Sequence, residues 1–166
     1  LGARRFEPIN QAVLSLIAAH EGDRAEAERG ALQALEISRE TGLRFAGPLI
    51  LGALAEVTDD EEVRRKSLAE GTAILDEKCV VHNYLWFYRS AMECMLRAEN
   101  FAGAEAFAQA ADDYMQAENN PWLALLVARA RVLIDIATHG PTPASLGQAR
   151  TLRDQMAGLG FCVMAA

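Results

Sequence analysis

The sequence is poor in cysteine and in aromatic residues, and each shortage excludes a class of protein. Its three cysteines, Cys79, Cys94 and Cys162, are odd in number and irregularly spaced, which argues against a disulfide framework. Only 7% of residues are aromatic, and β-branched residues are also few, so a protein built of strands is disfavoured. With 51% hydrophobic and 23% charged residues, the chain has a globular composition rather than a disordered one.

Basic blocks and long apolar runs are missing as well. The net charge is −7, so we expect neither nucleic acid nor an anionic membrane surface as a direct partner. The longest apolar run, Leu123 to Ala128, is far too short to span a bilayer, and the first residues show no signal-peptide pattern. Reduced thiols would suit a cytoplasmic protein. Because the chain begins with Leu1, we expect a fragment of a larger protein.

What is present is alanine, with 31 residues, and alanine favours helix and lets helices approach closely. Prolines stand where helices should begin and glycines where they should end. These marks predict an all-α chain of about eight helices, over 8–20, 24–41, 48–57, 60–78, 83–98, 101–118, 121–138 and 143–158.

Apolar spacing agrees with helix and predicts which side chains face the core. Three buried stripes are expected. They consist of Ile9, Val13, Leu16 and Ile17, of Leu32, Leu35 and Ile37, and of Leu126, Leu133, Ile134 and Ala137.

The first, third, fifth and seventh helices are predicted to begin near residues 8, 48, 83 and 121, at intervals of 35 to 40 residues. Such a period indicates an α-solenoid, here one domain over 1–166 of about four tetratricopeptide-like hairpins. The tetratricopeptide pattern is degraded. It survives in Gly22-Asp23, Leu51-Gly52 and Glu99-Asn100-Phe101, and in the small residues Ala27, Ala34, Ala104 and Ala111, which we expect to pack tightly.

No motif in the chain predicts catalysis. Glycine-rich phosphate loops and nucleophile motifs are missing, so we assign no catalytic and no cofactor-binding residue. Cys79 and His82 have a spacing that zinc could use, but a structural zinc needs four ligands and no second pair follows, so no metal is assigned. Asp112 and Asp113 are expected to form a solvated helix face.

The stretch from His82 to Glu93 holds four aromatic residues within five positions. Fitting the repeat pattern to it places Tyr88, Ala91, Met92 and Met95 in the core. The side chains directed to the concave, partner-binding side would be Trp86, Arg89, Glu93 and Arg97, with Arg129 extending the groove. The alternative is that the aromatics are core between repeats and that Arg89 pairs with Glu93 along the helix.

Several short segments resemble one bacterial family. They are Gly42 to Pro48, His82-Asn83, Trp86 to Arg89, Asn120-Pro121-Trp122 and Ala128-Arg129-Ala130. They are similar to the C-terminal repeat region of large proteins that join a class III adenylate/guanylate cyclase domain to an ATPase module and tetratricopeptide repeats. The likeness runs from about residue 2 to residue 161, and Asn119-Asn120 departs from it. It implies a sensory or protein-binding part, with the cyclase and ATPase chemistry upstream.

Three functions therefore stay open. The first is a non-catalytic protein- or peptide-binding, regulatory domain that is not an enzyme. The second is a stand-alone adaptor or self-association module, in which the apolar tail Phe161 to Met164 would help to form a homodimer. The third is a small-molecule-binding helical bundle.

Overall fold

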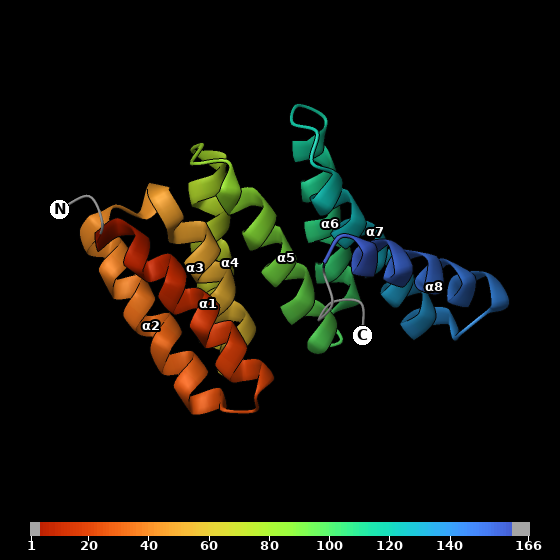
Figure 1. Cartoon of the computed structure of the whole chain (residues 1–166), viewed down its shortest axis with the longest axis horizontal. Coiled ribbons are helices and arrows are strands. Elements are labelled where there is room, and N and C mark those ends of the chain that lie inside the picture. Colours follow the sequence, from red (N-terminus) through yellow and green to blue (C-terminus); the bar gives the residue numbers. More distant parts are fainter. Residues whose placement is uncertain (1–3, 161–166) are drawn as a thin grey trace. The chain divides into compact units, whose positions relative to one another are not determined.

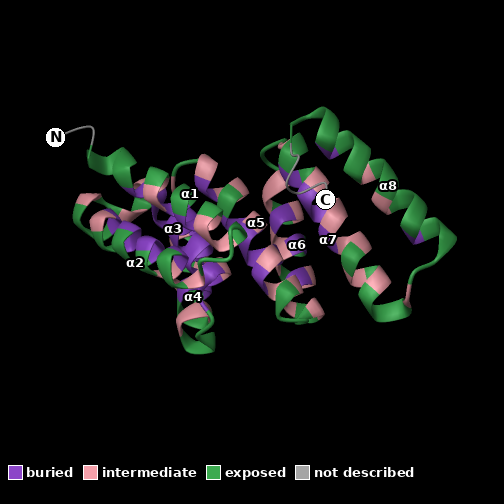
Figure 2. Ribbon diagram, turned by 60° about the horizontal axis from the view of Figure 1, so that its bottom comes forward, coloured by how far each residue is buried: buried purple, intermediate pink, exposed green. Residues whose placement is uncertain are grey.

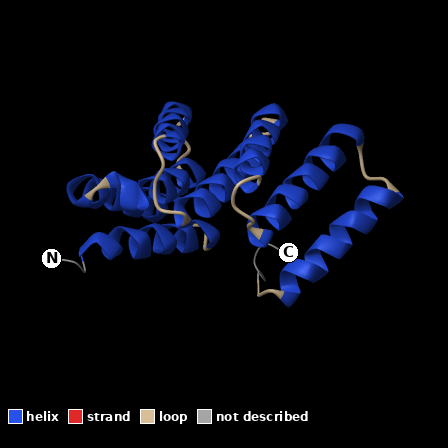
Figure 3. Cartoon of the chain, turned by 90° about the horizontal axis from the view of Figure 1, so that it is seen from above, coloured by secondary structure: helices blue, strands red, loops and turns tan. Residues whose placement is uncertain are grey.

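The computed structural model describes residues 4–160, and every element within them is helical (Figure 3). A short 3-10 turn, Arg4–Phe6, precedes eight α-helices. These are α1 (Glu7–His20), α2 (Arg24–Thr41), α3 (Leu43–Val57), α4 (Glu61–Asp76), α5 (His82–Arg97), α6 (Phe101–Met115), α7 (Pro121–His139) and α8 (Pro143–Gly158). The predicted all-α fold of helical hairpins is confirmed, whereas the apolar tail Phe161 to Met164 lies outside the described residues.

The helices fall into two compact units, Leu1–Cys94 and Met95–Ala166. The first holds α1 to α4 and most of α5, and the second holds the last turn of α5 together with α6, α7 and α8 (Figure 1). Their union into one solenoid domain stays a prediction.

A polar residue caps each even-numbered helix, which explains why these helices begin where they do. The side chain of Asp23 accepts a hydrogen bond from the backbone N–H of Glu26, and Asp60 accepts from Glu62 and Val63. Asn100 and Thr142 cap α6 and α8 in the same way. Such caps satisfy amide groups that have no partner within the helix.

In the first unit α3 packs against α1, α2 and α4. Eleven of its 15 residues are buried, which makes it the centre of this unit's core (Figure 2). The predicted tight packing of small residues is confirmed, since Ala27 and Ala34 here, and Ala104 and Ala111 in the second unit, are 0% exposed.

The predicted apolar stripes were partly wrong. In α1, Ile9 and Leu16 pack against the core, but their neighbours Val13 and Ile17 are exposed. α1 and α2 instead come close at small residues, since a Cβ on Gly30 would lie 2.6 Å from Ser15 Oγ. Leu32 and Leu133 are also exposed rather than buried.

The predicted start of the third helix at residue 48 was wrong, because α3 begins at Leu43 and contains Pro48. Proline has no N–H, so the carbonyl of Arg44 loses its partner within the helix. The N–H of Val80 donates to this carbonyl at 3.4 Å. The Asn83 amide donates to the carbonyl of Phe45 at 3.1 Å and accepts from the N–H of Leu49 at 3.3 Å. The loop before α5 and the first turn of α5 thus complete the hydrogen bonding of a helix that contains a proline.

In the second unit α7 packs against both α6 and α8. Arg131 of α7 joins it to α6 by ion pairs with Glu105 at 2.9 Å and with Asp112 at 2.6 Å. The expectation that Asp112 belongs to a solvated face was therefore wrong, although its neighbour Asp113 is exposed. Helix phase explains the difference, because adjacent residues point about 100° apart.

Candidate protein-interaction surface

Phe87 anchors α5 in the first unit. Its side chain is 0% exposed and lies over Gly71 of α4, where a Cβ would collide with the ring. Its backbone also approaches α3 closely, since a Cβ on Gly52 would lie 3.3 Å from the Phe87 Cα. Gly52 and Gly71, on neighbouring helices, therefore leave the space in which Phe87 packs, as the close packing of a core requires.

Two further contacts fix the first turns of α5. Asn83 is completely buried and bridges to α3 as described above. Tyr84 donates its hydroxyl to the carbonyl of Leu75 in α4 at 2.9 Å. Together with Phe87, these contacts hold α5 against both α3 and α4, so its exposed side chains are carried by a well-anchored helix.

Trp86 is a side chain of this helix that reaches solvent, with 39% of its surface exposed. Tyr88, Ala91 and Met92 are buried, as the fit to the repeat pattern predicts, and Met95 is half-buried. The sequence left open whether all the aromatics of this stretch are core. The structure separates them, because Phe87 and Tyr88 are core whereas Trp86 reaches solvent. Tryptophan is enriched among residues that dominate binding energy at interfaces.

Arg89 has a different role from the one predicted. Its guanidinium forms a two-pronged ion pair with Glu56 of α3, at 2.9 and 3.2 Å. The two side chains are only 13% and 11% exposed, so the charge of Arg89 is largely covered. Prediction from sequence missed Glu56, whose only signal is a lone charge after the apolar run that ends at Ala55. The pair positions α5 against α3 beside Trp86.

The remaining predicted groove residues are spread over both units. Glu93 is half-buried in the first unit. Arg97 is exposed and Arg129 half-buried in the second unit. By helical spacing, Trp86 and Glu93 follow one stripe of α5 within the first unit. We name these two residues the α5 surface. Arg97 and Arg129 belong to the second unit and are not included in it.

Cys79 and His82 lie at the start of the same helix. Burial raises the pKa of the Cys79 thiol, and burial lowers the pKa of His82. The His82 ring packs edge-on against Phe45, with ring centres 5.7 Å apart. Within residues 4–160 no group of three or more His, Cys, Asp or Glu side chains gathers in a way that could hold a metal. The contact that the structure gives the His82 ring is therefore an aromatic one with Phe45.

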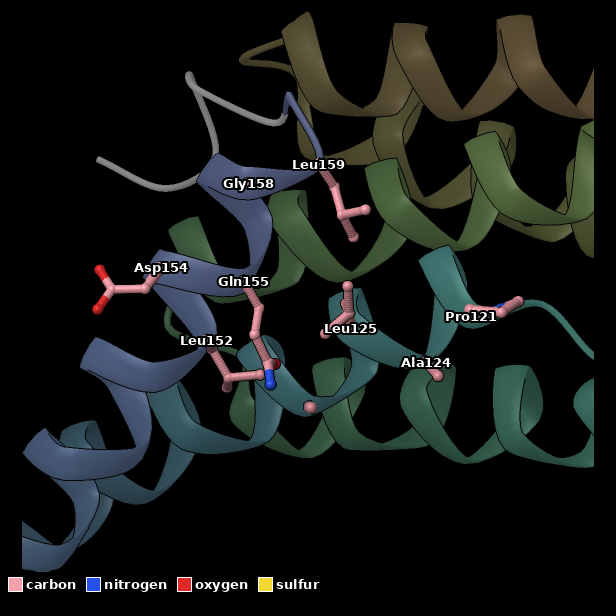
Figure 4. Close-up of a pocket in the computed structure, with 9 residues that line it drawn as sticks. Pro121, Ala124, Leu125, Leu152, Asp154, Gln155, Gly158 and Leu159 are labelled. Atoms are coloured by element: carbon pink, nitrogen blue, oxygen red, sulfur yellow. The ribbon is translucent and has the colours of Figure 1, made fainter.

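A separate pocket of about 670 Å³ lies between α7 and α8 (Figure 4). Its walls are mainly apolar and come from Pro121, Ala124, Leu125, Ala128, Leu152 and Leu159, with Gln155 as a polar member. The carboxylate of Asp154 points away from the space and pairs with Arg153 at 2.7 Å. Binding sites for small molecules usually add converging polar groups to apolar walls, and the residues that line this pocket supply little of that kind.

Comparisons with known proteins give no relative. No family model, curated protein or solved structure matches the chain. Among the described residues, no helix is long and apolar enough to cross a membrane.

Proposed function

We propose that this chain is a non-catalytic domain that binds a protein or peptide through the α5 surface. The observation that carries the proposal is Trp86, an exposed indole on a helix that is held in place by Phe87, Asn83 and the Arg89–Glu56 pair. A partner that covers Trp86 gains a large apolar contact, and little side-chain freedom is lost because the helix is already in place.

The two tryptophans make the proposal testable by fluorescence. Peptides selected from a displayed random library on the immobilised chain serve as probes. Trp122→Phe leaves Trp86 as the only indole, and we expect peptide binding to change its emission. Trp86→Phe leaves Trp122, which is 47% exposed in the second unit and is the matched control, and its emission should stay unchanged.

The same peptides should bind Trp86→Ala at least about tenfold more weakly, as expected for an interface hot spot. Trp122→Ala should bind them as the wild type does. Equal affinity for Trp86→Ala and wild type would exclude the α5 surface as the binding site. Failure to select any peptide would count against peptide binding itself.

The proposed setting is a regulatory region of a larger bacterial signalling protein of the cyclase and ATPase kind. It rests on the resemblance of the segments from Gly42 to Ala130. An immunoblot of the source cells tests it, because a band several times larger than 18.0 kDa is expected. The isolated chain should not turn over ATP or GTP, and turnover by clean protein would contradict the non-catalytic assignment.

We also propose a cytoplasmic location. Cys79 is a free thiol, as suits a reducing compartment. Fractionation of the source cells, followed by immunoblotting, tests this assignment.

A further inference from the structure

α1 and α3 begin two successive hairpins, which a shift of 37 residues relates, since it carries the cap Asp23 of α2 onto the cap Asp60 of α4. The two helices differ in burial, because α3 buries 11 of its 15 residues and α1 buries three of its 14. α3 packs against α1 and α2, which precede it, and against its own partner α4. The main contacts of α1 in the described part of the chain are with α2 and α3, which both follow it. The additional burial of α3 therefore corresponds to the hairpin that precedes it.

Three apolar side chains of α1 show where this burial is missing. Val13, Leu14 and Ile17, which we call the α1 face, are 44%, 58% and 46% exposed. The shift of 37 residues carries them onto three residues of α3, Ile50, Leu51 and Leu54. Those three side chains are at most 2% exposed and share one core cluster with small residues of α1 and α2. At these positions, the hairpin that precedes α3 contributes to the cover.

The direction of the α1 face agrees with this comparison. In α3, the side that α5 covers bears Gly52, which approaches Phe87, and Glu56, which pairs with Arg89. The same shift carries these two residues back to Ser15 and Ala19 of α1. By helical spacing the α1 face lies opposite Ser15 and Ala19. It therefore points away from the hairpin that follows and toward the place that a preceding hairpin would occupy.

Two polar residues beside the α1 face add a requirement for its cover. Glu7 corresponds to Arg44, and both are exposed, so this position lies outside the covered area. Asn10 is exposed, whereas its counterpart Gly47 is buried. A covered Asn10 needs a hydrogen-bond partner, because buried polar groups are normally paired. Asn83 shows such an arrangement in this unit, since it is a buried amide that bonds to the backbone of a neighbouring helix.

We propose that a further helical hairpin of the same protein, encoded before residue 1, covers the α1 face as the α1–α2 hairpin covers α3. In repeat proteins each hairpin packs on its neighbours in this way. The existing interface also defines the chemistry of the cover. The α2 residues in the core cluster are small and 0% exposed, namely Ala27, Ala31 and Ala34.

Small residues with the same spacing are therefore expected 37 positions earlier, on the second helix of the preceding hairpin. The inference rests on the proposed setting only in requiring sequence before residue 1. It makes no use of the α5 surface.

Hydrogen exchange, read by mass spectrometry, tests the cover in the full-length product of the native gene and in the 166-residue chain. Exchange over 7–20 should be at least about tenfold slower in the full-length protein, because a covered helix opens locally less often. Exchange over 101–115, in the second unit, is the internal reference and should be the same in both proteins.

Leu14→Glu tests whether the α1 face itself is covered. In the full-length protein it should speed exchange over 7–20 at least about tenfold, because it places a charge within the contact. In the 166-residue chain the change should be less than about twofold, since Leu14 is already exposed there. Leu32→Glu is the matched control. Leu32 is 48% exposed on α2 and its counterpart Ala69 is exposed too, so exchange over 7–20 should not change in either protein.

Several outcomes would overturn the proposal. A native gene product of 18.0 kDa would leave no preceding hairpin and would end the proposed setting as well. A larger product with equal exchange over 7–20 in the two proteins would overturn the covering hairpin alone. Protection that rises with protein concentration would assign the α1 face to a second copy instead. Preceding sequence without small residues at the expected spacing would contradict a hairpin of this kind. None of these exchange results bears on peptide binding at Trp86.

Discussion

α3 and α8 are helices of nearly equal length that are held by different means. α3 buries 11 of its 15 residues, and its position is fixed by other helices on several sides. α8 buries two of its 16, Ser145 and Met156, and begins with Pro143 and a capping box between Thr142 and Ser145. Good caps and a suitable sequence are enough to shape a helix, whereas burial is needed to hold it in place. We therefore expect α8 to open locally and α3 to open only with its whole unit.

The largest effect is expected from Phe87→Ala. The substitution leaves a cavity beside Gly52 and Gly71, and truncation of a buried Phe lowers the free energy of unfolding by about 3–5 kcal/mol. Urea unfolding followed by circular dichroism measures the loss. Phe6→Ala, which truncates a half-exposed Phe of the same unit, should cost about 1 kcal/mol or less. Equal losses in the two variants would mean that the core of the first unit is not centred on the ring of Phe87.

A smaller loss of unfolding free energy is expected from Asn83→Ala. It leaves the N–H of Leu49 and the carbonyl of Phe45 without the side chain that bonds both, and buried polar groups without partners cost about 2–3 kcal/mol here. The same urea titration measures it. Asn119→Ala, at an exposed loop position, should leave the unfolding midpoint unchanged. An unchanged free energy of unfolding in Asn83→Ala would show that water replaces the amide and that the start of α3 does not depend on the Asn83 side chain.

The smallest effect is expected from Thr142→Ala, and it should be confined to α8. Loss of the N-cap costs about 1 kcal/mol of helix stability. Hydrogen exchange read by mass spectrometry should show faster exchange over 143–158 and unchanged exchange over 43–57. Thr151→Ala is the control, because Thr151 lies within α8 and is not its cap. Faster exchange in α3 as well would show that the two regions do not open independently.

Prediction from the sequence was most accurate for helix boundaries that neighbouring residues determine. The ranges 24–41 and 143–158 agree with α2 and α8 to the residue, because Asp23 and Thr142 cap their starts and Gly42 ends α2 with a φ of 111°. Close packing at Ala27 and Ala34 was also predictable, since it follows from repeat spacing.

Contacts between distant residues account for what the sequence did not predict. Pro48 indicates a helix start by every local rule, and only Val80 and Asn83 show why it lies inside α3. The partner of Arg89 is Glu56, 33 residues away, and no spacing rule along α5 reveals it. Of the candidate site, Trp86 was identified as a residue type suited to binding, but its exposure depends on how Phe87 enters the core.

The bridge from Asn83 to Phe45 also sets an order of events during synthesis. The two residues are 38 positions apart, so at about 5–20 residues per second the ribosome adds Asn83 roughly 2–8 s after Phe45. Until then the Phe45 carbonyl and the Leu49 N–H lack the Asn83 side chain, and the Arg44 carbonyl that Pro48 leaves without a partner waits for Val80. The nascent first hairpin can form early, but α3 can settle on it in its final form only after the first turn of α5 has been made. A translational pause before residue 83 would therefore prolong the lifetime of an unfinished, alanine-lined apolar surface on the growing chain.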